Sequence, residues 1–275
     1  NIDILPYAML GARLSTATRA YLGVWVVLKR VTWVPLAISQ VSAVGVMAAF
    51  LLHELFGLHI PGSSPLLIWV LEPAWFSLIF TVAFALYFGR PGTGAERPVV
   101  ISYLVASALV LLLGGLVRQD IHDVQSILFG QTVLVEFSQM IMVAVGAALV
   151  VGVHLILFRR FLFVAFDPTT AGAAGVPVYG TEVALYATLA VMLSVATRAM
   201  GALPAFGLTV LPALAGLQVG RRMASTILTA VTVGLLSAGL GYYLSFVFDV
   251  SAGAAMVAIA SLCLGVLSLV RRFRG

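Results

Sequence analysis

Charged side chains are scarce in this sequence. Only 9% of its 275 residues are Asp, Glu, Lys or Arg, whereas 62% are hydrophobic; soluble domains carry about 25% charged residues. A soluble fold of this length cannot bury so large a share of apolar side chains. The composition, with a mean hydropathy of +1.13, therefore excludes an ordinary globular domain and indicates a surface that faces lipid.

Cysteine and nucleotide-binding motifs are nearly or wholly lacking. The single cysteine, Cys263, lies within the apolar run SLCLGVLSLV, so the sequence offers neither a disulfide framework nor a cysteine-based metal site. It has no GxxxxGK[ST] phosphate-binding loop. The net charge of +5 comes from short clusters between apolar runs, which is typical of membrane-protein loops rather than of a nucleic-acid surface. We therefore expect no catalytic residue and no cofactor in this chain.

Long apolar runs are what the sequence has in abundance. A helix needs about 20 apolar residues to cross the hydrocarbon layer. Nine runs qualify and predict an all-α, polytopic bundle in a single transmembrane domain, 1–275: 6–28, 33–56, 65–88, 98–117, 134–158, 182–199, 203–218, 225–247 and 252–270. The seventh is short and carries Pro204 and Pro212, so it either crosses or forms a broken, re-entrant helix. The expected number of crossings is eight or nine.

The basic residues predict an orientation, because cytoplasmic loops accumulate Lys and Arg. With nine crossings and an external N-terminus, eleven of the 15 basic residues fall on one face: Lys29, Arg30, Arg90, Arg97, Arg159, Arg160, Arg221, Arg222, Arg271, Arg272 and Arg274. The opposite face receives Arg118 and Arg198 with the acidic residues Glu54, Asp120, Asp123 and Asp249. This separation favours a cytoplasmic C-terminus and a seventh run that crosses.

The inner loop 159–181 contains a distinctive motif, FDPTTAGAAG at 166–175. Asp167 can cap the exposed N–H groups of a helix, and Pro168 suits its first turn. Small residues follow, and a glycine ends the motif. The motif predicts a short helix at about 166–175, parallel to the membrane surface and suited to docking in a partner's groove.

At these residues the chain resembles the permease subunits of zinc/manganese-type ABC importers. Further matches follow in the family's order: GVWVVLKRVTW at 23–33, ILFG at 127–130, GALPAFGLTVLPALAG at 201–216 and GLGYYLSFVFDVSAGAAMV at 239–257. The resemblance covers almost the whole chain. It implies the type II importer fold, in which two permease subunits enclose a pore.

The same resemblance implies partners and a location. A substrate-binding protein outside the membrane and separate ATPase subunits, which hold ATP and Mg²⁺, would complete the importer in a bacterial cytoplasmic membrane. The motif at 166–175 would be the coupling helix that contacts the ATPase, through Phe166, Asp167, Pro168, Ala171 and Gly175.

The second predicted span departs from this family. Its members typically carry an Asp and a His four residues apart there, a spacing that places two metal ligands on one helix face. The corresponding residues here are Leu36 and Gln40. Leucine cannot coordinate a metal, and a neutral amide binds zinc poorly.

Two explanations for this departure remain open. Either a paralogous permease subunit keeps the ligands in a heteromeric pore, or the transported substrate is not a bare divalent ion. Gln40, with Ser39 and Ser42, either lines the pore or makes hydrogen bonds between helices.

Three charged residues fall within predicted spans, where each charge costs at least ~2.5 kcal/mol. Arg13 and Arg19 either snorkel outward or line the pore. Glu72, beside Pro73, is the acidic residue best placed to pair with one of them; alternatively, a basic pore lining would fit an anionic or chelated substrate. The candidates for the translocation path are Arg13, Arg19, Leu36, Ser39, Gln40, Glu72, Pro204 and Pro212.

Histidines are few, and each has two interpretations. His53, Glu54 and His59 in HELFGLH are weak candidates for a metal site, but the spacing does not place both histidines on one helix face. A solvated cluster at the membrane edge is the alternative. For His154 we expect a buried structural hydrogen bond.

The sequence therefore predicts a transport subunit rather than an enzyme: the permease of an ATP-driven importer for zinc, manganese, iron or a metal-containing substrate. One rival is a degenerate subunit that mainly holds a heteromeric pore together. Another is a stand-alone ion-coupled carrier, which would need buried acidic residues at mid-membrane; only Glu72 and Glu136 come near that.

Overall fold

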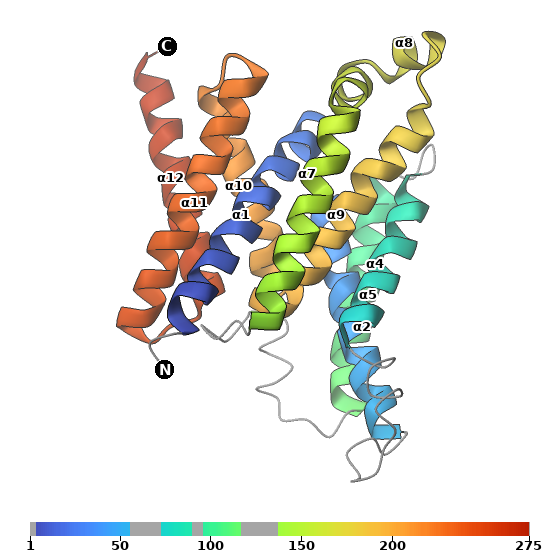
Figure 1. The fold of residues 1–275 in the computed structure, drawn as a ribbon, viewed down its shortest axis with the longest axis vertical. Coiled ribbons are helices and arrows are strands. Elements are labelled where there is room, and N and C mark those ends of the chain that lie inside the picture. Colours follow the sequence, from blue (N-terminus) through green and yellow to red (C-terminus); the bar gives the residue numbers. More distant parts are fainter. Residues whose placement is uncertain (1–3, 56–72, 90–95, 117–136, 275) are drawn as a thin grey trace.

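The computed structural model describes residues 4–55, 73–89, 96–116 and 137–274 (Figure 1). Within these ranges the chain is helical, with short connections and no strand. The helices are α1 Ile4–Leu28, α2 Val34–Leu55, α4 Pro73–Phe88, α5 Glu96–Leu116, α7 Phe137–Phe166, α8 Pro168–Ala173, α9 Val178–Met200, α10 Ala202–Val219, α11 Met223–Phe248 and α12 Ala252–Arg274. The all-α prediction is confirmed.

Seven of the described helices are long and apolar enough to cross a membrane: α2, α5, α7, α9, α10, α11 and α12. The described part of α4 is apolar but has only 16 residues. α1 is 25 residues long but is less apolar, because Arg13 and Arg19 interrupt it. Together these nine helices correspond one to one with the nine predicted runs.

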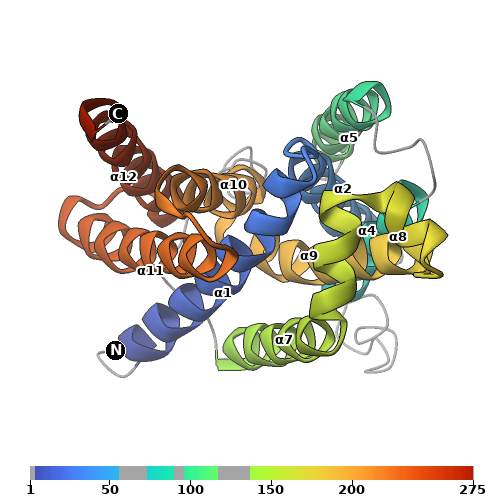
Figure 2. The same cartoon turned by 90° about the horizontal axis from the view of Figure 1, so that it is seen from above.

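α10 lies at the centre of one half of the bundle. It contacts α1, α2, α9, α11 and α12, and seen from above it lies between α11 and α12 on one side and α2 and α9 on the other (Figure 2). A Cβ atom added at Gly23 of α1 would lie 1.8 Å from the Thr209 carbonyl oxygen of α10. The two helices therefore approach so closely that their contact requires a glycine.

The sequence left two alternatives for the 203–218 segment, a crossing helix or a broken, re-entrant one, and the structure has an unbroken helix. α10 is one continuous helix of 18 residues with Pro212 inside it. Pro204 lies in the first turn, where backbone N–H groups have no partner within the helix, so the ring is tolerated. The helical conformation is interrupted at Gly201, directly before α10. Its φ of 86° and ψ of 160° are not helical, so α9 and α10 are separate helices.

The inner loop also differs from the expectation of a long connection at 159–181. α7 continues to Phe166, because Phe161 and Val164 lie on a buried face of the same helix. α9 begins at Val178. The predicted helix at 166–175 is consequently shorter, with six residues from Pro168 to Ala173, and Phe166 is the last residue of α7.

The ends of the bundle carry different charges. α1 and α7 end, α11 begins and α12 ends at the end of the molecule that carries α8, while α1 begins at the opposite end (Figure 1). The α8 end thus collects the basic clusters at 29–30, 159–160, 221–222 and 271–272. Glu54 and Asp249 lie where α2 and α11 finish at the other end. Among the described residues the basic clusters thus lie at the α8 end, together with Asp167 and Glu182, while Arg90, Arg118, Asp120 and Asp123 lie outside the described residues; the predicted orientation stays a prediction.

Candidate functional site

α8 is a short helix capped by its own neighbours. Asp167 is the N-cap: its Oδ1 accepts hydrogen bonds from the Thr170 amide at 3.0 Å and from the Thr169 hydroxyl at 2.9 Å, while its Oδ2 accepts from the Thr170 hydroxyl. Pro168 occupies the first turn, as predicted. The bonds from Thr170, and then from Thr169, lower the pKa of the Asp167 carboxyl below its ordinary 3.8, since they favour the ionised form.

The other end of α8 closes at Gly175. Its φ of 81° is left-handed, the Val176 amide donates to the Ala171 carbonyl at 3.0 Å, and the Gly175 amide donates to the Gly172 carbonyl at 3.0 Å. This pattern commonly ends helices and favours glycine. Ala171 is fully buried, while the rest of α8 is exposed. α8 is thus a small rigid element whose outer surface is open.

Phe166 supplies an apolar side chain beside this element. It is 68% exposed at the last residue of α7, directly before the cap. An exposed phenylalanine beside a capped helix offers an apolar side chain against which another protein can pack. The five predicted docking residues therefore lie together, and their contact with a partner stays a prediction.

A partly buried ion pair joins the α8 end of α1 to α9, and sequence reasoning missed it. The Lys29 ammonium bonds to the Glu182 carboxylate and lies 6.0 Å from the centroid of the Tyr186 ring. Between residues 137 and 248 the only acidic residues are Asp167 and Glu182. The sequence signal for this pair was Glu182, the single acidic residue at the start of a predicted span, together with the basic turn that contains Lys29.

Arg19 is the most buried charge in the described part of the chain, with no exposed surface. Its Nε donates to the Ser15 carbonyl at 3.2 Å, and one Nη donates to the Ala205 carbonyl at 3.2 Å. The other Nη donates to Thr16 Oγ1 at 3.1 Å and to Met200 Sδ at 3.0 Å. The guanidinium thus links α1 to both sides of the Gly201 break.

This geometry corrects the prediction for Arg19. A side chain with no exposed surface neither snorkels outward nor lines an open path in this chain, and all four bonding partners are neutral. Arg13 is exposed and lies over Gly239 of α11, since a Cβ added there would be 3.2 Å from its guanidinium. Glu72, the predicted pairing partner, lies outside the described residues.

The positions that replace the family's metal ligands lie on α2. Leu36 is partly buried, and Gln40 is 5% exposed with its Oε1 unbonded within the described structure. Ser39 donates to the Leu36 carbonyl at 2.9 Å, so its hydroxyl serves its own helix. Gln40 Oε1 is thus a buried polar atom on α2, but neither Gln40 nor Leu36 supplies a metal ligand.

A chain of three hydroxyls ties α2, α4 and α9 together. Ser42 and Ser77 are 2.7 Å apart, as are Ser77 and Ser194, and all three are buried. Ser42 therefore makes a bond between helices, one of its two predicted roles.

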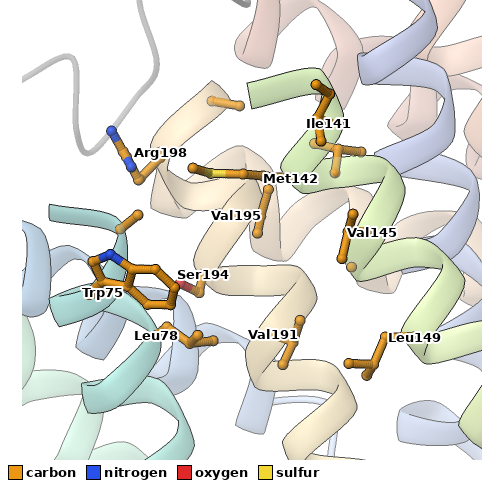
Figure 3. A pocket seen from close by; sticks show the side chains of 14 residues that line it. Trp75, Leu78, Ile141, Met142, Val145, Leu149, Val191, Ser194, Val195 and Arg198 are labelled. Carbon is orange, nitrogen blue, oxygen red and sulfur yellow. The ribbon is translucent and has the colours of Figure 1, made fainter. Parts of the chain in front are cut away.

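Ser194 also lines a cavity of about 360 Å³ between α4, α7 and α9 (Figure 3). The cavity walls are otherwise mainly apolar, and Trp75 and Met142 lie toward one end of the cavity. Arg198 lies at that end, away from Leu149. Among the predicted translocation residues that the structure describes, none lines this cavity. Its lining suits apolar contacts rather than ion coordination.

The histidines have local roles where the structure describes them. His53 lies 2.8 Å from the Ala49 carbonyl of its own helix, Glu54 is partly buried, and His59 lies outside the described residues. No group of three metal-ligating side chains occurs among the residues that the structure describes. His154 is 1% exposed and bonds to Tyr21 and Thr188 at 3.1 Å each, so the predicted buried hydrogen bond is confirmed.

Two features of the site thus define what the chain can do. One end presents a rigid helix and an exposed phenylalanine among basic clusters, which suits docking. The bundle below it is held by contacts between long apolar helices. A force on α8 would reach the bundle through α7 and α9, which contact α8 directly.

Comparison with protein families gives one match over nearly the whole chain. The model of the ABC 3 transport family matches residues 1–271.

The individual relatives share less than 30% of their residues with this chain. The manganese transport system membrane protein MntC of Listeria innocua is 29% identical over 164 residues, which are 60% of this chain and 58% of that protein. The high-affinity zinc uptake system membrane protein ZnuB of Haemophilus influenzae is 24% identical over 273 residues, 98% of each chain. Among solved structures, PsaBC from Streptococcus pneumoniae in complex with Fab has a TM-score of 0.78 at 21% identity, covering 95% of this chain and 90% of that one.

Proposed function

Because the chain belongs to the ABC 3 transport family, we propose that it is the membrane-spanning permease subunit of an ATP-driven importer. Its substrate would be a divalent metal ion, zinc, manganese or iron, or a metal-containing compound. The names of the MntC and ZnuB relatives support a metal. The chain itself would be a transport subunit and not an enzyme.

The observation that carries this proposal is the capped α8 at the basic end of the bundle. Its six residues are held by Asp167 at one end and Gly175 at the other, so the helix keeps its shape when it is pushed. A separate ATPase subunit, with ATP and Mg²⁺, would grip α8 and Phe166. Closure of the two ATPases would move α8, and α7 and α9 would pass that movement to the bundle.

The proposed orientation places α8 and the C-terminus in the cytoplasm and the N-terminus outside, in a bacterial cytoplasmic membrane. The basic clusters at the α8 end support it, because Lys and Arg accumulate in cytoplasmic loops. A substrate-binding protein would deliver substrate to the opposite end, and a second permease subunit would complete the pore.

A second candidate keeps the mechanism but changes the pore. Leu36 and Gln40 provide no metal ligand, and the buried Gln40 Oε1 is available to accept a hydrogen bond. This favours either a heteromeric pore whose other subunit holds the ligands, or a chelated or non-metal substrate.

The test is uptake and complex formation by the assembled importer. Vesicles that contain the chain with its copurified partners should accumulate radioactive zinc, manganese or iron when ATP is supplied. Asp167→Lys should abolish both ATPase copurification and uptake, since it removes the cap and reverses the charge. Asp249→Asn, at the other end of the bundle, is the matched control and should keep both.

Full ATPase binding by Asp167→Lys would contradict the coupling role. If no metal is taken up while ATPase copurifies, the second candidate is supported. A copurified permease with an Asp and a His four residues apart would then identify the heteromeric pore.

A further inference from the structure

Arg30 occupies a backbone conformation that favours glycine. Its φ is 60°, its amide donates to the Val27 carbonyl at 3.0 Å, and the Val31 amide donates to the Val26 carbonyl at 3.1 Å. These two bonds form the turn that ends α1. Glycine commonly fills the left-handed position of such a turn, and a long side chain such as that of arginine is disfavoured there. Folding alone does not explain an arginine at this position.

The Arg30 side chain differs from that of its neighbour. Lys29 is mostly buried and is neutralised by Glu182. Arg30 is exposed, and within the described part of the chain its guanidinium makes no hydrogen bond or ion pair. A strained residue with an available charge is a feature of binding sites, where the surroundings hold it in place.

A cavity of about 530 Å³ opens beside this turn. It is lined by the last residues of α1 and the turn, by the end of α7 and by α10: Val27, Leu28, Lys29, Arg30, Ala165, Phe166 and Leu217. Phe166 thus lines the cavity and directly precedes the Asp167 cap of α8. The cavity and α8 therefore form one continuous surface at the same end of the molecule.

We propose that Arg30 and this cavity form a second docking point for the ATPase partner and receive one of its acidic side chains. The proposal rests on the proposed function. A carboxylate can pair with the available guanidinium, while the apolar part of its side chain contacts Leu28 and Leu217. The continuity with Phe166 and α8 favours a protein partner over a lipid phosphate, which would be attracted by the same charge. Two contacts would hold the ATPase against rotation about α8.

The experiment exploits the strain at position 30. Arg30→Gly removes the charge but suits the backbone, so the purified permease should melt at the same temperature or higher. Its affinity for labelled ATPase, measured in phosphatidylcholine nanodiscs, should fall about tenfold or more, as for the loss of one close charge pair. Arg30→Lys should bind between Gly and wild type. Arg272→Ala removes a charge from the same end and should stay within about twofold.

The outcomes separate this inference from the proposed function. If Arg30→Gly binds ATPase like wild type while Asp167→Lys does not, the second docking point is wrong and the coupling role of α8 stands. If neither variant loses ATPase, both fall. If Arg30→Gly loses ATPase only in nanodiscs with anionic lipid, the site binds lipid phosphate and the inference is overturned.

Discussion

The buried centre around Arg19 and the exposed helix α8 handle charge in opposite ways. Arg19 has no exposed surface, and its donors reach residues of α1, α9 and α10 that are up to 186 positions away in sequence. The side-chain hydrogen bonds of Asp167 reach only residues within three positions. The first charge connects distant elements, whereas the second shapes only its own helix. Substitutions in the centre should therefore affect the fold, and substitutions in α8 should affect mainly the partner.

The largest effect is expected at the contact between α1 and α10, next to the buried centre. Gly23→Ala would place a Cβ 1.8 Å from the Thr209 carbonyl oxygen, so the two backbones must separate. We expect a loss of about 3 kcal/mol in the free energy of unfolding, typical of severe overpacking. Unfolding in mixed micelles measures it.

Gly265→Ala is the control for Gly23→Ala. Gly265 is also helical, but an added Cβ meets nothing within 4 Å. Its stability should stay the same or rise slightly, since alanine favours helix. Equal stabilities of the two variants would contradict the close α1–α10 contact.

A smaller effect is expected at Arg19. Whether the lysine or the methionine variant is less stable distinguishes a requirement for the hydrogen-bond geometry from a requirement for the charge. Arg19→Lys keeps the charge but cannot reproduce four bonds in a fixed plane, so it should cost about 2 kcal/mol. Arg19→Met removes the buried charge and keeps much of the volume; it should cost only about 1 kcal/mol. The Ala205 carbonyl keeps the Thr209 hydroxyl as a donor at 2.7 Å.

The same unfolding measurement decides between the two Arg19 variants. A methionine variant less stable than the lysine variant would show that the positive charge itself is required at this position. A nearby carboxylate would then have to be sought.

The smallest effect is expected at the α8 cap and is local. Because hydrogen bonds lower the pKa of Asp167 in the folded state, the cap is fully effective above the unfolded value of 3.8 and is lost as the pH falls below it. Hydrogen exchange of the α8 amides should be protected equally from about pH 8 to about pH 5, and less below 3.8.

Two variants test the cap without a change of pH. Asp167→Ala should lose the protection of α8 at every pH, whereas Asp167→Ser, a good N-cap without charge, should keep it at every pH. The melting temperature of the whole bundle should hardly change in either. A bundle that unfolds with Asp167→Ala would contradict the independence of α8.

The sequence predicts most of this fold because apolar runs of membrane length and the Asp167–Pro168 helix start are local signals. It does not predict that α7 continues to Phe166, since the charges at Arg159 and Arg160 suggested a loop. Whether α10 is continuous was left open, because the harmless first-turn position of Pro204 depends on where the helix begins.

The interactions of the site were harder to predict than its helices. The Lys29–Glu182 pair, the Arg19 bonds and the Ser42–Ser77–Ser194 chain join residues far apart in sequence, and no spacing rule indicates them. The strain at Arg30 arises from a backbone angle, which composition does not reveal. By contrast, the cap of α8 was predictable because all its partners are neighbours.

The most direct test of the central claim is the side of the membrane on which α8 lies. In a Cys263→Ala background, Ala173→Cys places a thiol on the exposed surface of α8, and Val250→Cys places one at the opposite end of the bundle. A maleimide that cannot cross membranes should label Ala173→Cys only from the cytoplasmic side and Val250→Cys only from outside. Labelling of Ala173→Cys only from outside would contradict both the orientation and the docking of an ATPase on α8.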